Sequence, residues 1–252
     1  MTPHKVIADR LLPLLKQVAD TSLEDAATLK FDKEHPQHLY AMCTYGTILE
    51  TTYDILALAD ARQFTSIPII LRTLLDAYAS FRSCIRDPNH FKAMYATHIK
   101  EKLRLVDAVT DSPDNPYLKG IAQAIDVKKE KASLEDELRG LKKQGYTPSR
   151  PWQEFEKAGL AGEYQSLYWQ LCLHAHNNVS ALEERHLNKK GDDYEVAYFK
   201  EADPADLARY FDSVCGLLLD ASKTLHNRLG SAADKHYDDL ANQLQEIRKE
   251  YA

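Results

Sequence analysis

Apolar side chains recur every three or four residues along most of the chain, which is the spacing of one face of an α-helix. Two stripes show this spacing most clearly, and each is wide enough to face a core. The first stripe is Tyr45, Ile48, Leu49, Thr52, Ile55, Leu56 and Ala59, and the second is Leu207, Tyr210, Phe211, Val214, Leu217, Leu218, Ala221 and Leu225. Proline follows a possible capping residue at positions 3, 36, 88, 113 and 204, as is common at helix N-termini.

This pattern predicts an all-α fold, a multi-helix bundle. Helices are expected near residues 4–19, 36–61, 67–86, 88–110, 114–143, 152–158, 162–187, 204–228 and 231–250. Only residues 194–199 (YEVAYF) predict a short strand or hairpin arm, because they follow a Gly-Asp-Asp turn.

The best loop candidate is residues 145–151 (GYTPSRP), which could separate two domains. The helices on both sides have incomplete apolar faces, however, so one domain over residues 1–252 is the better interpretation. Its terminal helices, 4–19 and 231–250, are expected at the periphery.

The charge balance excludes some partners. The 252 residues carry a net charge of −6 and are 44% hydrophobic and 28% charged. This balance argues against broad coating of double-stranded DNA or of an anionic membrane, although a small basic site for RNA stays possible. The alternating charges of residues 126–144 predict a solvated helix face, with a nucleic-acid patch as the alternative.

The cysteines and the N-terminal segment point to the cytoplasm. Cys43, Cys84, Cys172 and Cys215 are widely spaced in apolar stretches, and no CxxC pair occurs, so we expect buried thiols in a reducing compartment. The N-terminal segment lacks the apolar core of a signal peptide. The most apolar run, residues 67–75, is too short to cross a bilayer.

Two charged residues stand inside the apolar helix 67–86. Arg72 and Asp76 are one turn apart, in the order that adds least to helix stability. Glu50 and Asp54 of the preceding helix are possible partners. The four residues predict either a structural ion-pair network between two packed helices or a polar functional site on rigid helices.

A second group of polar residues is the histidine pair His174 and His176, which flanks an apolar stripe. On a helix these two side chains point about 200° apart, so they cannot hold one metal ion, and we expect neither a metal nor a cofactor. His176 with Asn177 is the better candidate for a functional pair, because imidazole exchanges protons near neutral pH and an amide fixes a substrate oxygen. The alternative is a hydrogen-bonded packing histidine. The chain carries none of the common nucleotide-binding or hydrolase fingerprints.

The segments RQFTSIPIILRTLLDAYASFRSCIRDP (Arg62–Pro88) and EYQSLYWQLCLHAHNNV (Glu163–Val179) resemble a bacterial family, domain of unknown function 5677. Arg72, Asp76 and His176 fall on the pattern of that family. The family is similar to the HEPN helical bundles, many of which are dimeric RNases of toxin–antitoxin and phage-defence systems. The resemblance therefore implies a HEPN-like bundle. The Arg-to-His spacing of HEPN nucleases does not occur on any one helix here, so Arg72 and His176 would have to meet from separate helices.

Two functional hypotheses follow. The first is a non-catalytic bundle that binds a protein partner or a small effector, in a bacterial defence or toxin–antitoxin context. The second is a metal-independent RNase in which Arg72 holds a phosphate, His176 is the general acid or base with Asn177 beside it, and Asp76 or Glu50 orients them. Under either hypothesis we expect a homodimer, because Tyr-rich helical faces often need a second copy to cover them.

Overall fold

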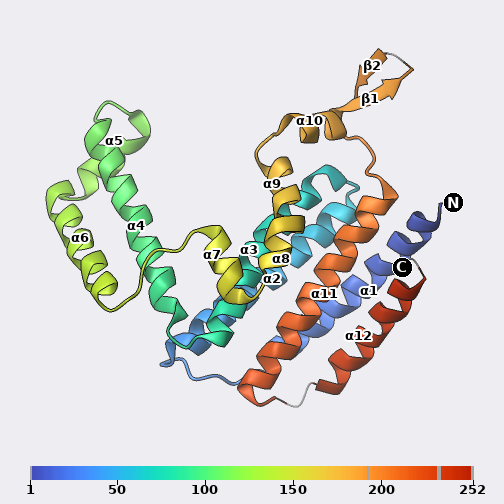
Figure 1. The fold of residues 1–252 in the computed structure, drawn as a ribbon, viewed down its shortest axis with the longest axis horizontal. Coiled ribbons are helices and arrows are strands. Elements are labelled where there is room, and N and C mark those ends of the chain that lie inside the picture. Colours follow the sequence, from blue (N-terminus) through green and yellow to red (C-terminus); the bar gives the residue numbers. More distant parts are fainter. Residues whose placement is uncertain (1, 192, 232–233, 251–252) are drawn as a thin grey trace. The chain divides into compact units, whose positions relative to one another are not determined.

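Helices make up nearly all of the regular structure, as the apolar spacing predicts. The computed structural model describes residues 2–191, 193–231 and 234–250 (Figure 1). The α-helices are α1 (Pro3–Ala26), α2 (Pro36–Asp60), α3 (Ile67–Arg86), α4 (His90–Asp111), α5 (Pro116–Ala124), α6 (Val127–Lys143), α7 (Pro151–Ala158), α8 (Ala161–Glu163), α9 (Trp169–Ala175), α10 (Val179–His186), α11 (Pro204–Leu229) and α12 (Asp234–Lys249). Two further helical segments occur: η1 (Phe64–Ser66), a 3-10 turn that is wound more tightly than an α-helix, and η2 (Tyr164–Tyr168), a π-helical segment that is wound more widely. The prediction of an all-α bundle is confirmed.

The predicted helix 114–143 is divided into α5 and α6. The backbone at Ile125 is extended, and Asp126 begins α6 as its N-cap, accepting a hydrogen bond from the Lys129 N–H at 3.1 Å. An aspartate that caps a helix stops the preceding one, because its own backbone is not helical.

The predicted helix 162–187 is also interrupted. Asn177 has a positive φ of 50°, and Asn178 caps α10 by accepting a hydrogen bond from the Ser180 N–H at 3.1 Å. Asparagine tolerates the left-handed conformation better than most residues. As a result His176 and Asn177 lie in the break between α9 and α10 and not within one helix.

The extended segment is a hairpin that begins earlier than predicted. Strand β1 (Leu187–Lys190) pairs antiparallel with β2 (Asp193–Val196), and Leu187 lies opposite Val196. The predicted segment 194–199 therefore supplies the second strand as far as Val196, while residues 197–199 lie outside it.

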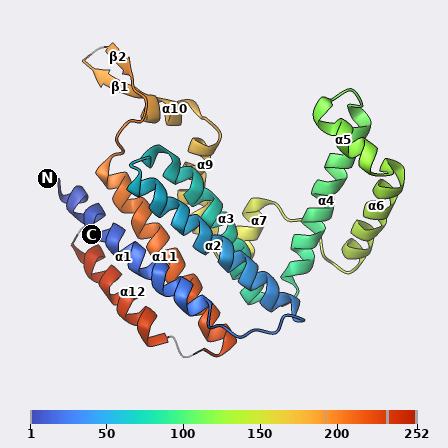
Figure 2. The ribbon, with the colours of Figure 1, turned by 180° about the vertical axis from the view of Figure 1, so that it is seen from behind.

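The described chain forms two compact units, residues 87–154 and the remainder. In the larger unit α2 lies along α3, and α1 lies along α11, with α12 beside both (Figures 1 and 2). Both terminal helices contribute buried side chains to this unit: Leu11, Leu15 and Val18 of α1 are 0% exposed, and Tyr237 and Leu240 of α12 are 1% exposed. Whether the chain folds as a single domain stays a prediction.

A buried hydroxyl cluster joins α1, α2 and α11. The Ser222 Oγ lies 2.9 Å from the Ser22 Oγ and 2.8 Å from the Tyr45 hydroxyl. Burial raises the pKa of the Tyr45 phenol. Because buried hydroxyls are costly unless they are hydrogen-bonded, this cluster favours one register of the three helices.

The smaller unit has a core of its own, in which α4 packs against α6. Ala96, Ile99, Val106, Leu134 and Leu138 form this core and are all buried. Helix α6 is amphipathic along its length: its hydrophobic side faces α4 and its charged side faces solvent.

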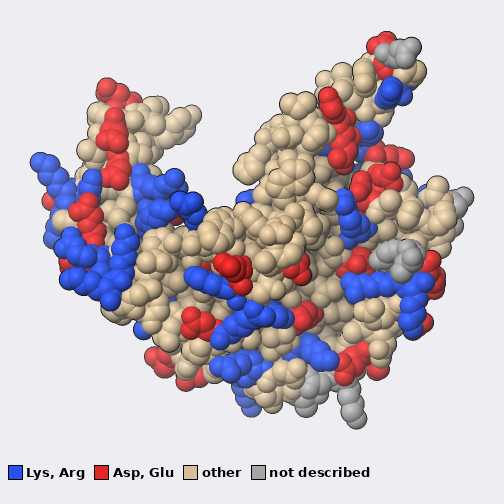
Figure 3. All heavy atoms as spheres, viewed as in Figure 1, with Lys and Arg blue, Asp and Glu red and all other residues tan. Residues whose placement is uncertain are grey.

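Charged side chains of both signs share the surface. On the face drawn in Figure 3, Lys and Arg lie among Asp and Glu. In the smaller unit Lys131 pairs with Asp107 at 2.6 Å, and Arg139 pairs with Asp136 at 3.3 Å. Such pairing is typical of a solvated helix face. None of the helices in the described ranges is long and apolar enough to cross a membrane.

Candidate functional site

Arg72 of α3 reaches across to the chain segment that precedes and forms α9. Its Nη2 donates a hydrogen bond to the Tyr168 hydroxyl at 2.9 Å, and its Nε donates to the Cys172 Sγ at 3.2 Å. The guanidinium carbon also lies 5.2 Å from the centroid of the Tyr168 ring. These contacts are charge-assisted, and they fix α9 against α3.

Asp76 is a weaker partner of Arg72 than the sequence suggests. The Asp76 Oδ2 is 3.8 Å from the Arg72 Nη2, longer than a hydrogen bond, and the aspartate side chain is 41% exposed. Burial raises the pKa of Asp76, and the charge of Arg72 only partly offsets that rise. The predicted proximity of the two residues is present, but the strong contacts of Arg72 are with Tyr168 and Cys172.

Tyr168 is held in place by an aromatic cluster. Its ring centroid is 4.7 Å from that of Phe155 and 5.2 Å from that of Tyr164, and its side chain is buried. Tyr164–Tyr168 is the π-helical segment η2. A π-helical turn inserts an extra residue into the helix and re-aims the side chains that follow, which is why such turns are frequent at functional sites.

The other predicted site residues lie apart from Arg72. Glu50 and Asp54 are exposed on α2, and within the described chain no ion pair joins either of them to Arg72 or Asp76. His176 and Asn177 are exposed in the break after α9, and no hydrogen bond of the described residues links them to Arg72. The structure therefore brings Arg72 and Asp76 together and leaves Glu50, His176 and Asn177 separate.

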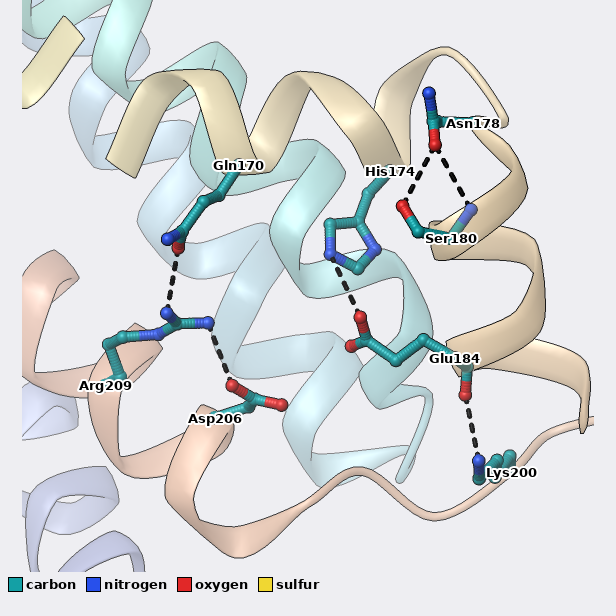
Figure 4. A network of polar contacts seen from close by, with 8 residues as sticks. All are labelled: Gln170, His174, Asn178, Ser180, Glu184, Lys200, Asp206 and Arg209. Carbon is teal, nitrogen blue, oxygen red and sulfur yellow. Dashed lines mark hydrogen bonds and ion pairs between the residues drawn. The ribbon is translucent and has the colours of Figure 1, made fainter. Parts of the chain in front are cut away.

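His174, two residues before His176, enters a cleft between α9, α10 and α11. The cleft has a volume of about 380 Å³, and its lining includes Phe64, His174, Glu184, Asp206 and Tyr210. In Figure 4 the imidazole extends from α9 toward Glu184 of α10. Sites for small ligands are usually clefts of this size, about 300–1,000 Å³, with a few convergent polar groups.

The imidazole of His174 is buried and incompletely hydrogen-bonded. The residue is 8% exposed, and its Nε2 lies 3.9 Å from the Glu184 Oε2, which is beyond hydrogen-bond distance. Its Nδ1 is buried and has no hydrogen-bond partner in the described part of the chain. Burial lowers the pKa of His174, and the nearby Glu184 only partly counters this, so the ring is neutral at pH 7.

A set of hydrogen bonds holds the walls of the cleft (Figure 4). Arg209 of α11 donates to the Gln170 side chain of α9 at 2.9 Å and to Asp206 at 2.8 Å. The Lys200 ammonium donates to the backbone carbonyls of Glu184 at 3.0 Å and Leu187 at 2.9 Å, which secures the end of α10. These contacts orient the three helices before any ligand is present.

Tyr210 of α11 adds a phenol to the lining of the cleft. Burial, followed by the Asp206 carboxylate, raises the pKa of the Tyr210 phenol to about 12, so it stays protonated as a hydrogen-bond donor. No group of three or more metal-ligating side chains occurs among the described residues.

Sequence reasoning passed over most of this cleft. The sequence favoured His176 with Asn177 over His174, and it did not single out Glu184 or Arg185. The available signal was Asn178, a typical capping residue that predicts a break after His176 and a new helix carrying Glu184.

One known protein family matches the chain. Residues 38–195, more than half of its length, match the model of a family of unknown function, DUF5677. The chain belongs to this family. The expectation of membership, based on the segments around Arg72 and His176, is thereby confirmed. No curated protein and no solved structure matches the chain.

The family match covers only part of the cleft. It includes Arg72, Tyr168, His174 and Glu184, whereas the wall that α11 supplies begins at Pro204, beyond the matched residues.

We expect the contact between Arg72 and Tyr168 to be worth about 1 kcal/mol in a double-mutant cycle, because Tyr168 is buried and Arg72 is half-buried, so water replaces the hydrogen bond poorly. Arg72→Ala should lower the free energy of unfolding by about 1–3 kcal/mol, as expected when a charge-assisted hydrogen bond is lost. The cycle uses Arg72→Ala, Tyr168→Phe and the double variant, followed by urea denaturation.

Lys249→Ala is the control for that cycle, since its ion pair with Glu246 lies on the surface and both side chains are more than half exposed. It should change stability by less than about 0.5 kcal/mol. Strictly additive effects of Arg72→Ala and Tyr168→Phe would show that the two side chains do not interact.

We expect His174 to destabilise the protein in acid. In the unfolded chain the His174 imidazole takes up a proton near pH 6.5. In the folded chain its pKa is lowered, so it takes up the proton only at a lower pH. Stability attributable to His174 is therefore complete above pH 6.5 and is lost progressively below it. The free energy of unfolding of wild type minus that of His174→Gln, measured from pH 8 to about pH 5, should decrease as the pH falls, because glutamine does not titrate. Parallel curves would contradict a buried neutral imidazole.

Proposed function

We propose that the chain is a non-catalytic helical module that binds a small effector in the cleft between α9, α10 and α11. The observation that carries the proposal is the buried, neutral imidazole of His174, whose Nδ1 lacks a partner within the described residues and whose Nε2 faces the Glu184 carboxylate across 3.9 Å. A buried polar group without a partner costs about 1–3 kcal/mol, and a bound ligand removes this cost.

The spacing of the polar groups supports binding over catalysis. A carboxylate that orients a catalytic imidazole lies within about 2.6–3.2 Å of it, and the Glu184 Oε2 is 3.9 Å from the His174 Nε2. Two basic groups of the walls are engaged, Lys200 with backbone carbonyls and Arg209 with Gln170 and Asp206. The Nε of Arg185, a third basic residue of the lining, is buried and has no hydrogen-bond partner among the described residues. Preorganised walls lower the entropic cost of holding a ligand.

We expect fragments to bind the cleft of the wild-type protein and not that of Ala202→Trp. Ala202 lines the cleft and is half-buried, so an indole there occupies the space without removing any of the hydrogen bonds above. Ligand-observed NMR with a fragment set, with unchanged circular dichroism as the folding control, measures this. Fragment binding that is the same in both proteins would place the ligand elsewhere.

The wider context is also a proposal. We propose a bacterial, cytoplasmic protein that is related to the HEPN bundles and works in a defence or toxin–antitoxin system. The resemblance of the segments around Arg72 and His176 supports the relationship, and the all-α fold is compatible with it. The four cysteines are free thiols, which is usual in a reducing compartment. Cys84 and Cys215 are buried as expected, whereas Cys172 is half-buried and Cys43 is exposed.

The alternative function is a metal-independent RNase that uses Arg72 and His176, with Asp76, Glu50 and Asn177 in support. It requires the side chains of Arg72 and His176 to meet on one phosphate. Arg72 is engaged with Tyr168 and Cys172, while His176 is exposed beyond the end of α9. The RNase is therefore the second candidate function.

We expect purified wild type to leave total cellular RNA intact on a denaturing gel, with or without chelator. The Arg72→Ala/His176→Ala variant is the control. Cleavage by wild type and not by the variant would replace the binding proposal with the RNase.

We also propose that the chain forms a homodimer. An apolar groove of about 370 Å³, lined by residues of α10 and of the hairpin that follows it, supports this. Val179, Leu182, Val196 and Tyr198 line this groove and are 69%, 39%, 59% and 78% exposed. A two-stranded hairpin is only marginally stable by itself in water, so a second copy packed on β2 would stabilise it.

We expect light scattering to give twice the chain mass of 28.7 kDa. Leu182→Glu/Val196→Glu should give the single-chain mass, because each charge is placed in the apolar groove, whereas Leu23→Glu on α1 should stay dimeric. A single-chain mass for wild type would remove the dimer from the proposal.

A further inference from the structure

We infer that the smaller unit carries an anion site for a phosphate monoester joined to a small apolar group. This inference goes beyond the proposed function, because the site shares no residue with the cleft beside His174. It depends on a basic cleft of about 480 Å³ within residues 87–154. The lining includes Lys100 of α4, Lys142 at the end of α6, and Arg150 and Trp152 around the start of α7.

The basic cleft holds positive charge that the described chain does not neutralise. Three of its lining residues, Lys100, Lys142 and Arg150, are basic and none of the described lining residues is acidic, which gives a formal charge of +3. All three are exposed, and none of them takes part in an ion pair within the described chain. Like charges repel one another, so an anion that enters the cleft relieves a repulsion present in the free protein.

Carboxylates close to these bases along the chain have other partners. Glu101, the residue after Lys100, pairs with Arg104 at 3.1 Å. In the first turn of α7, the Glu154 Oε2 lies 2.8 Å from the Nε2 of the buried His90. These two carboxylates are therefore directed to other groups, and the lining of the basic cleft stays positive.

The first turn of α7 adds to the attraction for an anion. The Gln153 side-chain oxygen accepts a hydrogen bond from the Arg150 N–H at 2.8 Å, which leaves the amide nitrogen as a donor in the lining of the cleft. The N-terminal end of a helix also carries a partial positive charge. In Figure 3 basic side chains gather around the C-terminal end of α6, in the same unit.

The three bases match a phosphate monoester better than a carboxylate. Such an ester carries a charge of about −1.5 to −2 at pH 7 and has three strong acceptor oxygens, whereas a carboxylate has two oxygens and a single charge. A guanidinium can donate to two phosphate oxygens at once. The volume of the cleft is within the range of about 300–1,000 Å³ that is usual for small ligands, so it suits a small ester.

Trp152 and Pro148 supply an apolar side of the basic cleft. Trp152 is 44% exposed, so a large part of its indole contacts water in the free protein. An apolar group attached to the phosphate would cover this surface and remove it from water. A phosphate that carries such a group should therefore bind more tightly than inorganic phosphate.

Isothermal titration with phenyl phosphate, inorganic phosphate and benzoate tests the inference. Phenyl phosphate should bind wild type at one site. Inorganic phosphate lacks the ring and benzoate carries a single charge, so each should bind about tenfold more weakly or worse. Fluorescence places the ligand: the chain has two tryptophans, so Trp169→Phe leaves Trp152 as the reporter, and its emission should change in a saturable way with phenyl phosphate.

Substitutions in the lining should separate the two parts of the ligand. Lys100→Gln and Lys142→Gln should each weaken phenyl phosphate binding about tenfold, as expected for the loss of a charge-assisted hydrogen bond. Lys143→Gln is the matched control, because Lys143 is the adjacent exposed lysine of α6 and does not line the cleft; it should change the affinity by less than about twofold. Trp152→Ala should reduce the affinity for phenyl phosphate to that for inorganic phosphate. Unchanged circular dichroism is the folding control.

Other outcomes overturn the inference. Equal binding of phenyl phosphate to wild type, Lys100→Gln and Lys142→Gln would remove the basic cleft from the interaction, and no binding to wild type would remove this ligand class. A single-stranded oligonucleotide that binds more tightly than phenyl phosphate, and is lost in Lys100→Gln, would replace the small ester with nucleic acid.

The failure of this inference and the failure of the proposed function are distinguishable. Ala202→Trp, which fills the cleft beside His174, should bind phenyl phosphate as wild type does. Loss of phenyl phosphate binding in Ala202→Trp, with binding retained in Lys100→Gln, would move the phosphate to the cleft beside His174 and overturn the inference.

Discussion

The guanidinium of Arg72 joins α3 to α9, the helix that carries His174 into the cleft. Arg72 donates to Tyr168 immediately before α9 and to Cys172 within it, so two points of one short helix are fixed to a long one. A helix of seven residues has little stability of its own and relies on such packing. His174 follows Cys172 by two residues, so the same contact determines where the imidazole lies.

The break after α9 completes the arrangement. Asn177 turns the chain and Asn178 caps α10, which brings Glu184 opposite His174. α10 then has two different sides: Glu184 and Arg185 line the charged cleft, while Val179 and Leu182 line the apolar groove.

Periodicity in the sequence predicted the bundle because helical spacing is repeated over long segments and survives small local errors. It also singled out Arg72, since a charge inside a run of Ile and Leu needs a partner. The partners could not be predicted, because Tyr168 and Cys172 are distant in the sequence and the intervening π-helical turn changes the phase of the helix. The same limit explains the choice of His176 over His174: the pattern continues smoothly through residues 176–178, and only the asparagine chemistry there marks a break. Cap and turn residues are local signals, whereas the cleft is assembled from three helices whose approach is set by packing.

The most direct test of the account compares two histidines within one protein. The imidazole resonances of His174 and His176, assigned in histidine-labelled protein, are followed by NMR while a fragment that binds the wild-type protein is added. The account predicts that His174 shifts in a saturable way and that His176 stays unchanged, because only the former lies in the cleft. A shift of His176 with no change at His174 would contradict the account and return attention to the exposed break after α9.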